Sequence, residues 1–138
     1  MAQEPRQLAA NEWGTITYYP QWNTVELKWG KQTRSMNEDG FKETLQILAD
    51  QGVEIRPDFM IVDSIEFFYQ IGDGILAWRN DHIVPLYNEA GLKKFAFLVT
   101  EAMPGTVEKG AEPAPDGPAA FPTAWFETKE RMYEWLSG

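Results

Sequence analysis

The middle of the chain contains two short apolar runs separated by a long helical pattern. The first run, at residues 59–62, ends at Asp63, and the second, at residues 95–99, ends at Thr100. Strands that are covered on both faces read as continuous apolar runs, and such strands belong to parallel sheets joined by crossover helices. The pattern therefore predicts a strand, a helix over residues 72–90 and a second strand parallel to the first.

Two alternating segments come before this unit. Residues 13–19 alternate around a glycine, and residues 24–29 place Val25, Leu27 and Trp29 on one face and polar side chains on the other. Residues 20–23 between them favour a turn. We expect an antiparallel hairpin at one edge of the sheet, with one face of the hairpin exposed.

The first helix begins near Ser35 or Asn37, either of which can cap it, and Gly52 is expected to end it. Its apolar side chains recur at helical spacing, at Phe41, Leu45, Ile47 and Leu48. This stripe predicts a helix that packs on the sheet along one side.

The second helix contains Pro85, which predicts a kink or a break near Val84. A short strand at residues 124–126 follows, and a final helix capped by Thr128 ends the chain. The second helix is expected to place its apolar face at Ile71, Ile75, Trp78, His82, Ile83, Leu86 and Ala90. The final helix is expected to turn Met132, Trp135 and Leu136 toward the core.

These elements predict a single α/β domain over residues 13–138. We expect a four- to five-stranded, mostly parallel sheet with an N-terminal antiparallel hairpin and three to four helices. A chain of 138 residues is long enough to bury one hydrophobic core. Residues 1–12 lack periodicity and are expected to form a flexible N-terminal arm. Residues 101–121 are rich in proline and glycine and are expected to form a long surface loop.

The chain carries a formal net charge of −9, from 21 acidic and 12 basic residues. Proteins that bind nucleic acids present a basic surface to the phosphates, so this balance argues against nucleic acid and against anionic membrane surfaces. The apolar runs have the length of strands, well short of the roughly 20 residues of a membrane-spanning helix. We expect a soluble, cytoplasmic protein.

The chain has no cysteine and one histidine, His82. A zinc site needs several such ligands at regular spacing, and a serine triad would have to use this same histidine without a Gly-x-Ser-x-Gly turn. No phosphate-binding glycine pattern occurs either. We therefore expect no metal and no cofactor, with His82 on or beside the apolar face of the second helix.

Four short motifs follow one another in a fixed order. They are Ile61-Val62-Asp63, Trp78, Ala90-Gly91-Leu92-Lys93-Lys94-Phe95-Ala96-Phe97, and Phe126 with Thr128 and Tyr133-Glu134-Trp135-Leu136. Over about residues 15–136 this order resembles the SpoIIAA-like proteins of bacteria, which are related in fold to STAS domains and to CRAL-TRIO lipid carriers. The resemblance implies a largely parallel sheet with helices packed on it, and a family whose members mostly lack an assigned activity.

STAS proteins that antagonise anti-sigma factors carry a phosphorylatable serine or threonine at the start of the helix after the central strand. The matching turn in this chain is Ile71-Gly72-Asp73-Gly74, so Asp73 occupies the phosphoacceptor position. An aspartate is not a substrate of a serine kinase, and the chain departs from the family pattern there. A carboxylate at this position is also simply a good helix cap.

Polar residues follow the two central strands, and the carboxyl ends of parallel strands meet at one edge of a sheet. Asp63 and Ser64 follow the first strand, and Thr100 and Glu101 the second. An enzyme would use Asp63 as a general base beside Glu101. We favour the simpler interpretation that these are turn and cap residues.

Phe67, Phe68 and Tyr69 lie in the connection between the first central strand and the second helix. With Trp78 they form either a hydrophobic plug under the helix or the wall of an apolar pocket. We favour the plug, and this connection is nevertheless the first place to look for a ligand.

The lack of a catalytic constellation makes a non-enzymatic regulatory or protein-interaction module our leading hypothesis. A carrier of an apolar small molecule or lipid is the alternative, and an enzyme that uses Asp63 and Glu101 ranks third. Self-association as a homodimer would use Val25, Leu27 and Trp29. The predicted binding rim comprises Asp63, Ser64, Phe67, Phe68, Tyr69, Asp73, Trp78, Thr100 and Glu101.

Overall fold

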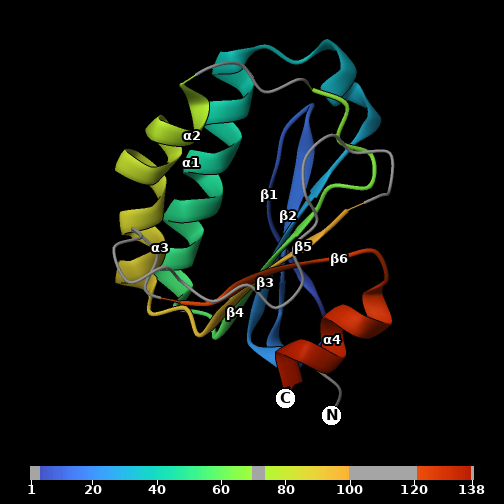
Figure 1. Cartoon of the computed structure of the whole chain (residues 1–138), viewed down its shortest axis with the longest axis vertical. Helices are drawn as coiled ribbons and strands as arrows, with labels where there is room; N and C mark the ends of the chain where they lie inside the picture. Colours follow the sequence, from blue (N-terminus) through green and yellow to red (C-terminus); the bar gives the residue numbers. More distant parts are fainter. Residues whose placement is uncertain (1–3, 70–73, 100–120, 138) are drawn as a thin grey trace.

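The computed structural model describes residues 4–69, 74–99 and 121–137 (Figure 1). One sheet holds six strands in the order of the chain, of which the first three are antiparallel and the last four, from β3 on, are parallel. The strands are β1 (Arg6–Ala10), β2 (Gly14–Tyr19), β3 (Thr24–Trp29), β4 (Phe59–Asp63), β5 (Lys94–Leu98) and β6 (Thr123–Phe126). The predicted mixed α/β fold, with an antiparallel hairpin followed by parallel strands, is confirmed.

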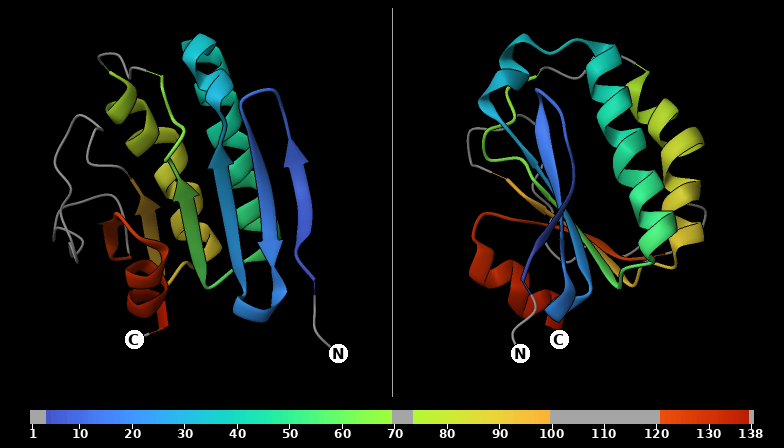
Figure 2. Two further views of the ribbon diagram at one scale, coloured as in Figure 1. Left: turned by 90° about the vertical axis from the view of Figure 1, so that its right-hand side faces the viewer. Right: turned by 180° about the vertical axis from the view of Figure 1, so that it is seen from behind.

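Helices cover both faces of this sheet (Figure 2). The first three lie together on one face, called the α1 face here, and the last packs against β5 and β6 on the opposite α4 face. They are α1 (Glu38–Ile55), α2 (Ile75–Trp78), α3 (Val84–Ala90) and α4 (Lys129–Ser137), with a π-helical segment Arg79–Ile83 between α2 and α3. No helix in the described ranges is both long and apolar enough to cross a bilayer.

The core on the α1 face is built from the side chains that the sequence pattern places there. Phe41, Leu45 and Leu48 of α1 are buried, and Asn37 caps this helix by accepting a hydrogen bond from the Gly40 N–H at 2.8 Å. On the α4 face Thr128 accepts from the Arg131 N–H, and Met132 is fully buried. Each fully buried apolar side chain of this size stabilises the fold by about 1.5–3 kcal/mol.

The N-terminal part of the sheet differs from the prediction. Residues expected in a flexible arm form β1, which pairs with β2 and brings the sheet to six strands. The sequence gives little sign of this strand, because the register shifts between Gln7 and Ala9 and breaks the alternation.

The predicted position of the hairpin at the edge of the sheet is also wrong, because β1 pairs with β2 on one side and β4 pairs with β3 on the other. In β3, both Thr24 and Glu26 are buried on the α4 face. Val25, Leu27 and Trp29 are buried on the α1 face. These three side chains therefore belong to the core and do not provide the surface for self-association that we considered.

Helix α1 continues past the glycine that was expected to end it. Gly52 lies inside the helix and is buried, and a Cβ atom there would be 2.9 Å from Met60 Cε. The helix ends at Ile55, and Arg56 adopts the left-handed conformation with φ of 56°. Gly52 therefore packs closely on the end of the Met60 side chain of β4, and its place near the end of the helix makes it resemble a terminating glycine in the sequence.

The predicted break near Val84 is confirmed, and Pro85 explains it. Proline has no backbone N–H to donate four residues back, and its ring clashes with that carbonyl. The chain takes a π-helical turn instead, in which the Val84 N–H donates to the Arg79 carbonyl. This wider turn rotates the later side chains, so that Ile83 is buried while His82 is exposed beside the apolar face.

Candidate functional site

The carboxyl end of β4 holds two of the predicted rim residues, Asp63 and Ser64. Both are buried, with 4% and 5% of their surface exposed. The Ile65 N–H donates to Asp63 Oδ1 at 3.1 Å, and the Ser64 N–H donates to the Leu98 carbonyl at 2.8 Å. The two residues thus turn the chain out of the strand, as the simpler interpretation predicts.

Three other predicted rim residues, Asp73, Thr100 and Glu101, lie outside the described residues. The pairing of Asp63 with Glu101 in an enzyme therefore stays a hypothesis. No group of three or more histidine, aspartate or glutamate residues that could hold a metal ion occurs within the described part of the chain.

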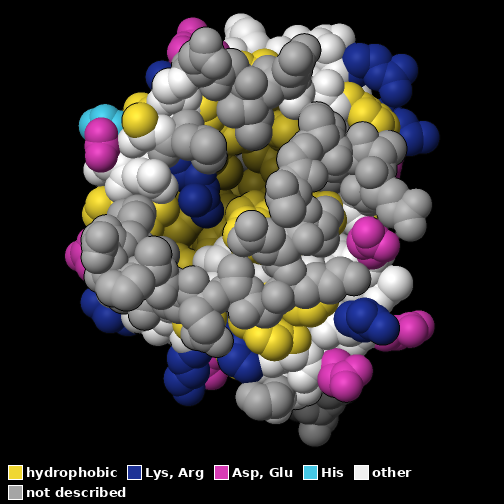
Figure 3. All heavy atoms as spheres, viewed as in Figure 1, with side chains coloured by type: hydrophobic (Ala, Val, Ile, Leu, Met, Phe, Trp, Pro, Cys, Tyr) yellow, Lys and Arg dark blue, Asp and Glu magenta, His cyan; other side chains and the backbone are white. Residues whose placement is uncertain are grey.

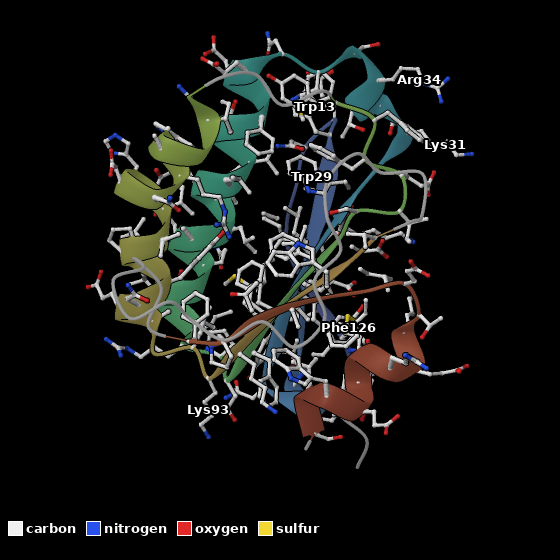
Figure 4. The ribbon with its side chains drawn as sticks, viewed as in Figure 1. Trp13, Trp29, Lys31, Arg34, Lys93 and Phe126 are labelled. Carbon is white, nitrogen blue, oxygen red and sulfur yellow. The ribbon has the colours of Figure 1, made fainter. Side chains whose placement is uncertain are left out.

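Phe67 and Tyr69 fill the space between the end of β3 and α1. The Phe67 ring lies 5.0 Å from that of Trp29, and the Tyr69 ring stacks at 5.6 Å on Phe41. Trp29 and Phe41 stack on each other at 5.7 Å, and Figure 4 shows Trp29 in the layer between sheet and helix. Phe67 and Tyr69 are therefore part of the core between β3 and α1, while the predicted plug under the second helix would also have used Phe68 and Trp78.

Phe68, between these two aromatic residues, points the other way. Its side chain is 46% exposed, and the guanidinium carbon of Arg34 lies 4.8 Å from the ring centroid. Ile65 in the same loop is 38% exposed. Figure 4 shows Lys31 and Arg34 projecting outward from the short helical segment after β3. We call Ile65, Phe68 and Arg34 the rim anchor.

The loop that carries the rim anchor is held in place by Thr33, which is fully buried. The Phe68 N–H donates to Thr33 Oγ1 at 2.8 Å. The hydroxyl in turn lies within donating distance of the carbonyls of Gly30, at 2.9 Å, and Glu66, at 3.1 Å. A buried hydroxyl with partners on both sides fixes the backbone, so Phe68 is exposed from an ordered loop.

Trp78 is the remaining predicted rim residue, and it lies at the surface of α2. Lys42 Nζ of α1 lies 5.2 Å from its ring centroid, and the exposed His82 ring lies 6.0 Å away. Trp78 therefore joins α1 and the crossover segment and is not part of the rim anchor.

A buried carboxylate on the α4 face was missed by the sequence analysis. Glu26 of β3 accepts a hydrogen bond from the Tyr19 hydroxyl at 3.2 Å. Burial raises the pKa of Glu26, and the charge of Asp63 raises it further. Glutamate in an alternating strand is typical of an exposed face, and only the packing of neighbouring elements over β3 makes this one buried.

A groove at the start of β2 and the end of β3 was also missed. It has a volume of about 380 Å³ and is lined mainly by residues 11–15 and 28–32, with Glu66 at its side. The Trp13 N–H and the Gly14 N–H both donate to Asn11 Oδ1, so the turn that forms one wall satisfies its own polar groups. The groove is open, and the Asn11 side chain in its wall is occupied by these hydrogen bonds.

Comparison of the chain with protein-family models, with curated proteins and with solved structures found no match.

Proposed function

We propose that the chain is a protein-binding module without catalytic activity, and that the rim anchor is its contact surface. The observation that carries this proposal is the exposed Phe68 side chain, held by the buried Thr33 and covered on one side by Arg34. Aromatic residues and arginine are enriched among the side chains that dominate protein–protein binding energies.

The order of this loop favours tight binding. A side chain that is already fixed loses little conformational freedom when a partner covers it, so more of the contact energy appears as affinity. The backbone of Phe68 is tied to Thr33, which lies 35 residues earlier in the chain. The backbone from which the ring projects is therefore fixed, and Arg34 contacts the ring on one side.

The partner that fits the rim anchor has an apolar pocket with a carboxylate at its border. Phe68 and Ile65 would fill the pocket, and Arg34 would pair with the carboxylate. Among the described residues no carboxylate forms an ion pair with Arg34, although the neighbouring Lys31 Nζ lies 3.9 Å from Glu66 Oε2. Lys31 and Arg34 thus place two cationic side chains at this surface of a chain whose net charge is −9, which favours an acidic partner surface.

The burial and hydrogen bonding of Asp63 support a role other than catalysis. A general base must reach the substrate proton, whereas Asp63 is buried and accepts a hydrogen bond from its own turn. Membership of the SpoIIAA-like family, a bacterial source and a cytoplasmic location are part of the same proposal and rest on the sequence motifs and composition.

The test compares two aromatic residues of equal exposure at different places. Trp22 is 46% exposed, as is Phe68, and lies in the turn between β2 and β3. Proteins captured by the immobilised chain from its native lysate would be identified, and their affinities measured for wild type, Phe68→Ala, Arg34→Ala and Trp22→Ala. We expect about a tenfold or greater loss for Phe68→Ala and little change for Trp22→Ala. Equal losses for both aromatic variants would contradict the proposal.

A further inference from the structure

Arg79 lies in the π-helical segment and reaches over the α1 face of the sheet. Its guanidinium carbon lies 5.7 Å from the ring centroids of Tyr87 and Phe95 and 5.8 Å from that of Phe97. Such contacts favour a cation through the negative faces of the rings. Three rings from α3 and β5 thus hold one positive charge above the sheet. We call these four residues the Arg79 cluster.

The donors of this guanidinium are not used within the described part of the chain. No carboxylate there forms an ion pair with Arg79, and no hydrogen bond from Arg79 to another described residue occurs. A guanidinium has five N–H donors, and aromatic rings satisfy the charge without accepting all of them. The side chain is only partly buried, so an acceptor from outside can reach it.

A second polar group in the Arg79 cluster also lacks a partner. The Tyr87 side chain is completely buried, and among the described residues its hydroxyl is the buried side-chain polar atom without a hydrogen-bond partner. Buried hydroxyls are normally paired, and an unpaired one costs about 1–3 kcal/mol. Burial raises the pKa of Tyr87 to about 12 although the charge of Arg79 opposes this, so the hydroxyl is a donor at neutral pH.

The surroundings of the Arg79 guanidinium are apolar and partly open. The rings of Phe97 and Trp125 stack at 5.6 Å, and both are partly exposed. Figure 3 shows a hollow between the helical layer and the sheet, with hydrophobic side chains on its floor and a Lys or Arg side chain at its border. A concave apolar surface with a few polar groups is the usual form of a small-molecule site.

From these observations we propose that the Arg79 cluster and Trp125 bind a small apolar monocarboxylate. The carboxylate would accept two hydrogen bonds from the Arg79 guanidinium, a geometry that planar guanidinium and carboxylate groups share. The Tyr87 hydroxyl would donate to the same carboxylate. The apolar body of the ligand would lie on the rings of Phe97 and Trp125.

The site is separate from the rim anchor and uses none of its residues. A π-helical turn often marks a functional site in a helix, and here the turn lies between Arg79 and Tyr87 of the Arg79 cluster. Carboxylate binding at the Arg79 cluster can therefore be tested independently of the protein-binding function.

Isothermal titration calorimetry on the full chain tests this proposal with matched pairs of probes. Naphthoate is compared with naphthylmethanol, and octanoate with octanol, so that each pair differs in the carboxylate alone. Of the two acids, we expect the one that binds more tightly to bind about tenfold more tightly than its matched alcohol. The preferred pair also tells whether the apolar body is aromatic or aliphatic.

Substitutions assign the effect to the Arg79 cluster. Arg79→Gln is expected to abolish the preference for the acid, Arg79→Lys to keep part of it, and Tyr87→Phe to weaken acid binding by roughly threefold. Arg131→Gln changes an exposed arginine on α4 and is expected to leave binding unchanged. Thermal unfolding checks that each variant is folded, and Phe68→Ala should bind the acid as wild type does.

Two results would overturn the proposal. One is that neither acid binds the wild-type chain, or binds no better than its alcohol. The other is that Arg131→Gln weakens acid binding as much as Arg79→Gln does, which would mean that the net charge of the chain and not a site sets the affinity.

Discussion

The Tyr19 hydroxyl donates a hydrogen bond to Glu26 Oε1 at 3.2 Å across the two neighbouring strands β2 and β3. Burial and the hydrogen bond to Glu26 both contribute to raising the pKa of Tyr19 to about 12. Burial, followed by the charge of Asp63, raises the pKa of Glu26. The α4 face therefore contains an ionisable pair whose protonation is linked to folding.

Glu26→Gln is expected to stabilise the protein at pH 7 by roughly 1 kcal/mol. The raised pKa means that the folded protein binds this proton more readily than the unfolded chain, whose glutamate titrates near 4.5. The free energy of unfolding of wild type should thus fall as pH rises from 4.5 through the folded pKa. Urea unfolding of both proteins across this range measures the difference, which should shrink at acidic pH.

The control for this prediction is Glu43→Gln, at an exposed position of α1. It should change stability little at any pH. An advantage of Glu26→Gln that stays constant down to acidic pH would show that the carboxylate charge is not its cause.

Tyrosine ionisation predicts a loss of stability at alkaline pH. The pKa values of Tyr19 and Tyr87 are raised to about 12, and burial also raises that of Tyr133. In the unfolded chain these residues lose their protons near pH 10, so the free energy of unfolding should fall between pH 10 and 12. Absorbance titration of the folded protein should show three of the five tyrosines ionising late, and titration of all five near pH 10 would contradict this.

The same substitution at two buried tyrosines should have opposite effects. Tyr87→Phe removes a hydroxyl without a hydrogen-bond partner and should stabilise the unliganded protein by about 1 kcal/mol. Tyr19→Phe removes the donor to the buried Glu26 carboxylate and should destabilise it by about 1–3 kcal/mol. Thermal unfolding of both variants at pH 7 measures the signs, and a loss of stability in Tyr87→Phe would show that its hydroxyl has a partner.

Two glycines of α1 should respond differently to alanine, although helix propensity favours alanine at both by about 1 kcal/mol. A Cβ at Gly40 would lie 2.6 Å from Trp13 Nε1 and 3.0 Å from Met36 Cγ. A Cβ at Gly52 meets only the flexible end of Met60 at short range. Urea unfolding should show Gly40→Ala destabilised and Gly52→Ala close to wild type, and the reverse order would contradict this packing.

The sequence predicts the parts of the fold in which one element's own pattern decides its structure. The continuous apolar runs of β4 and β5 require cover on both faces, and the stripe of α1 supplies it on one of them. The cap at Asn37 and the effect of Pro85 are equally local. The position of β1 is not determined locally, since its pairing with β2 depends on main-chain hydrogen bonds that leave little pattern in the side chains.

The candidate sites depend on contacts between distant segments, and the sequence does not reveal these. Phe68 is exposed because Thr33 fixes its loop, and Glu26 is buried by the elements packed around β3. Arg79 reaches the rings of β5 from the segment between α2 and α3, a contact between elements that no local pattern predicts. The run Phe67-Phe68-Tyr69 did indicate the right segment, but not which ring faces outward.

The most direct test of the protein-binding function is photo-crosslinking from the rim anchor in living cells of the source organism. A photoreactive phenylalanine replaces Phe68 in one sample and Trp22, at the distant turn after β2, in the other. The account predicts a discrete protein adduct from position 68 that Arg34→Ala removes, and no such adduct from position 22. The same adducts from both positions, or none from position 68, would contradict it.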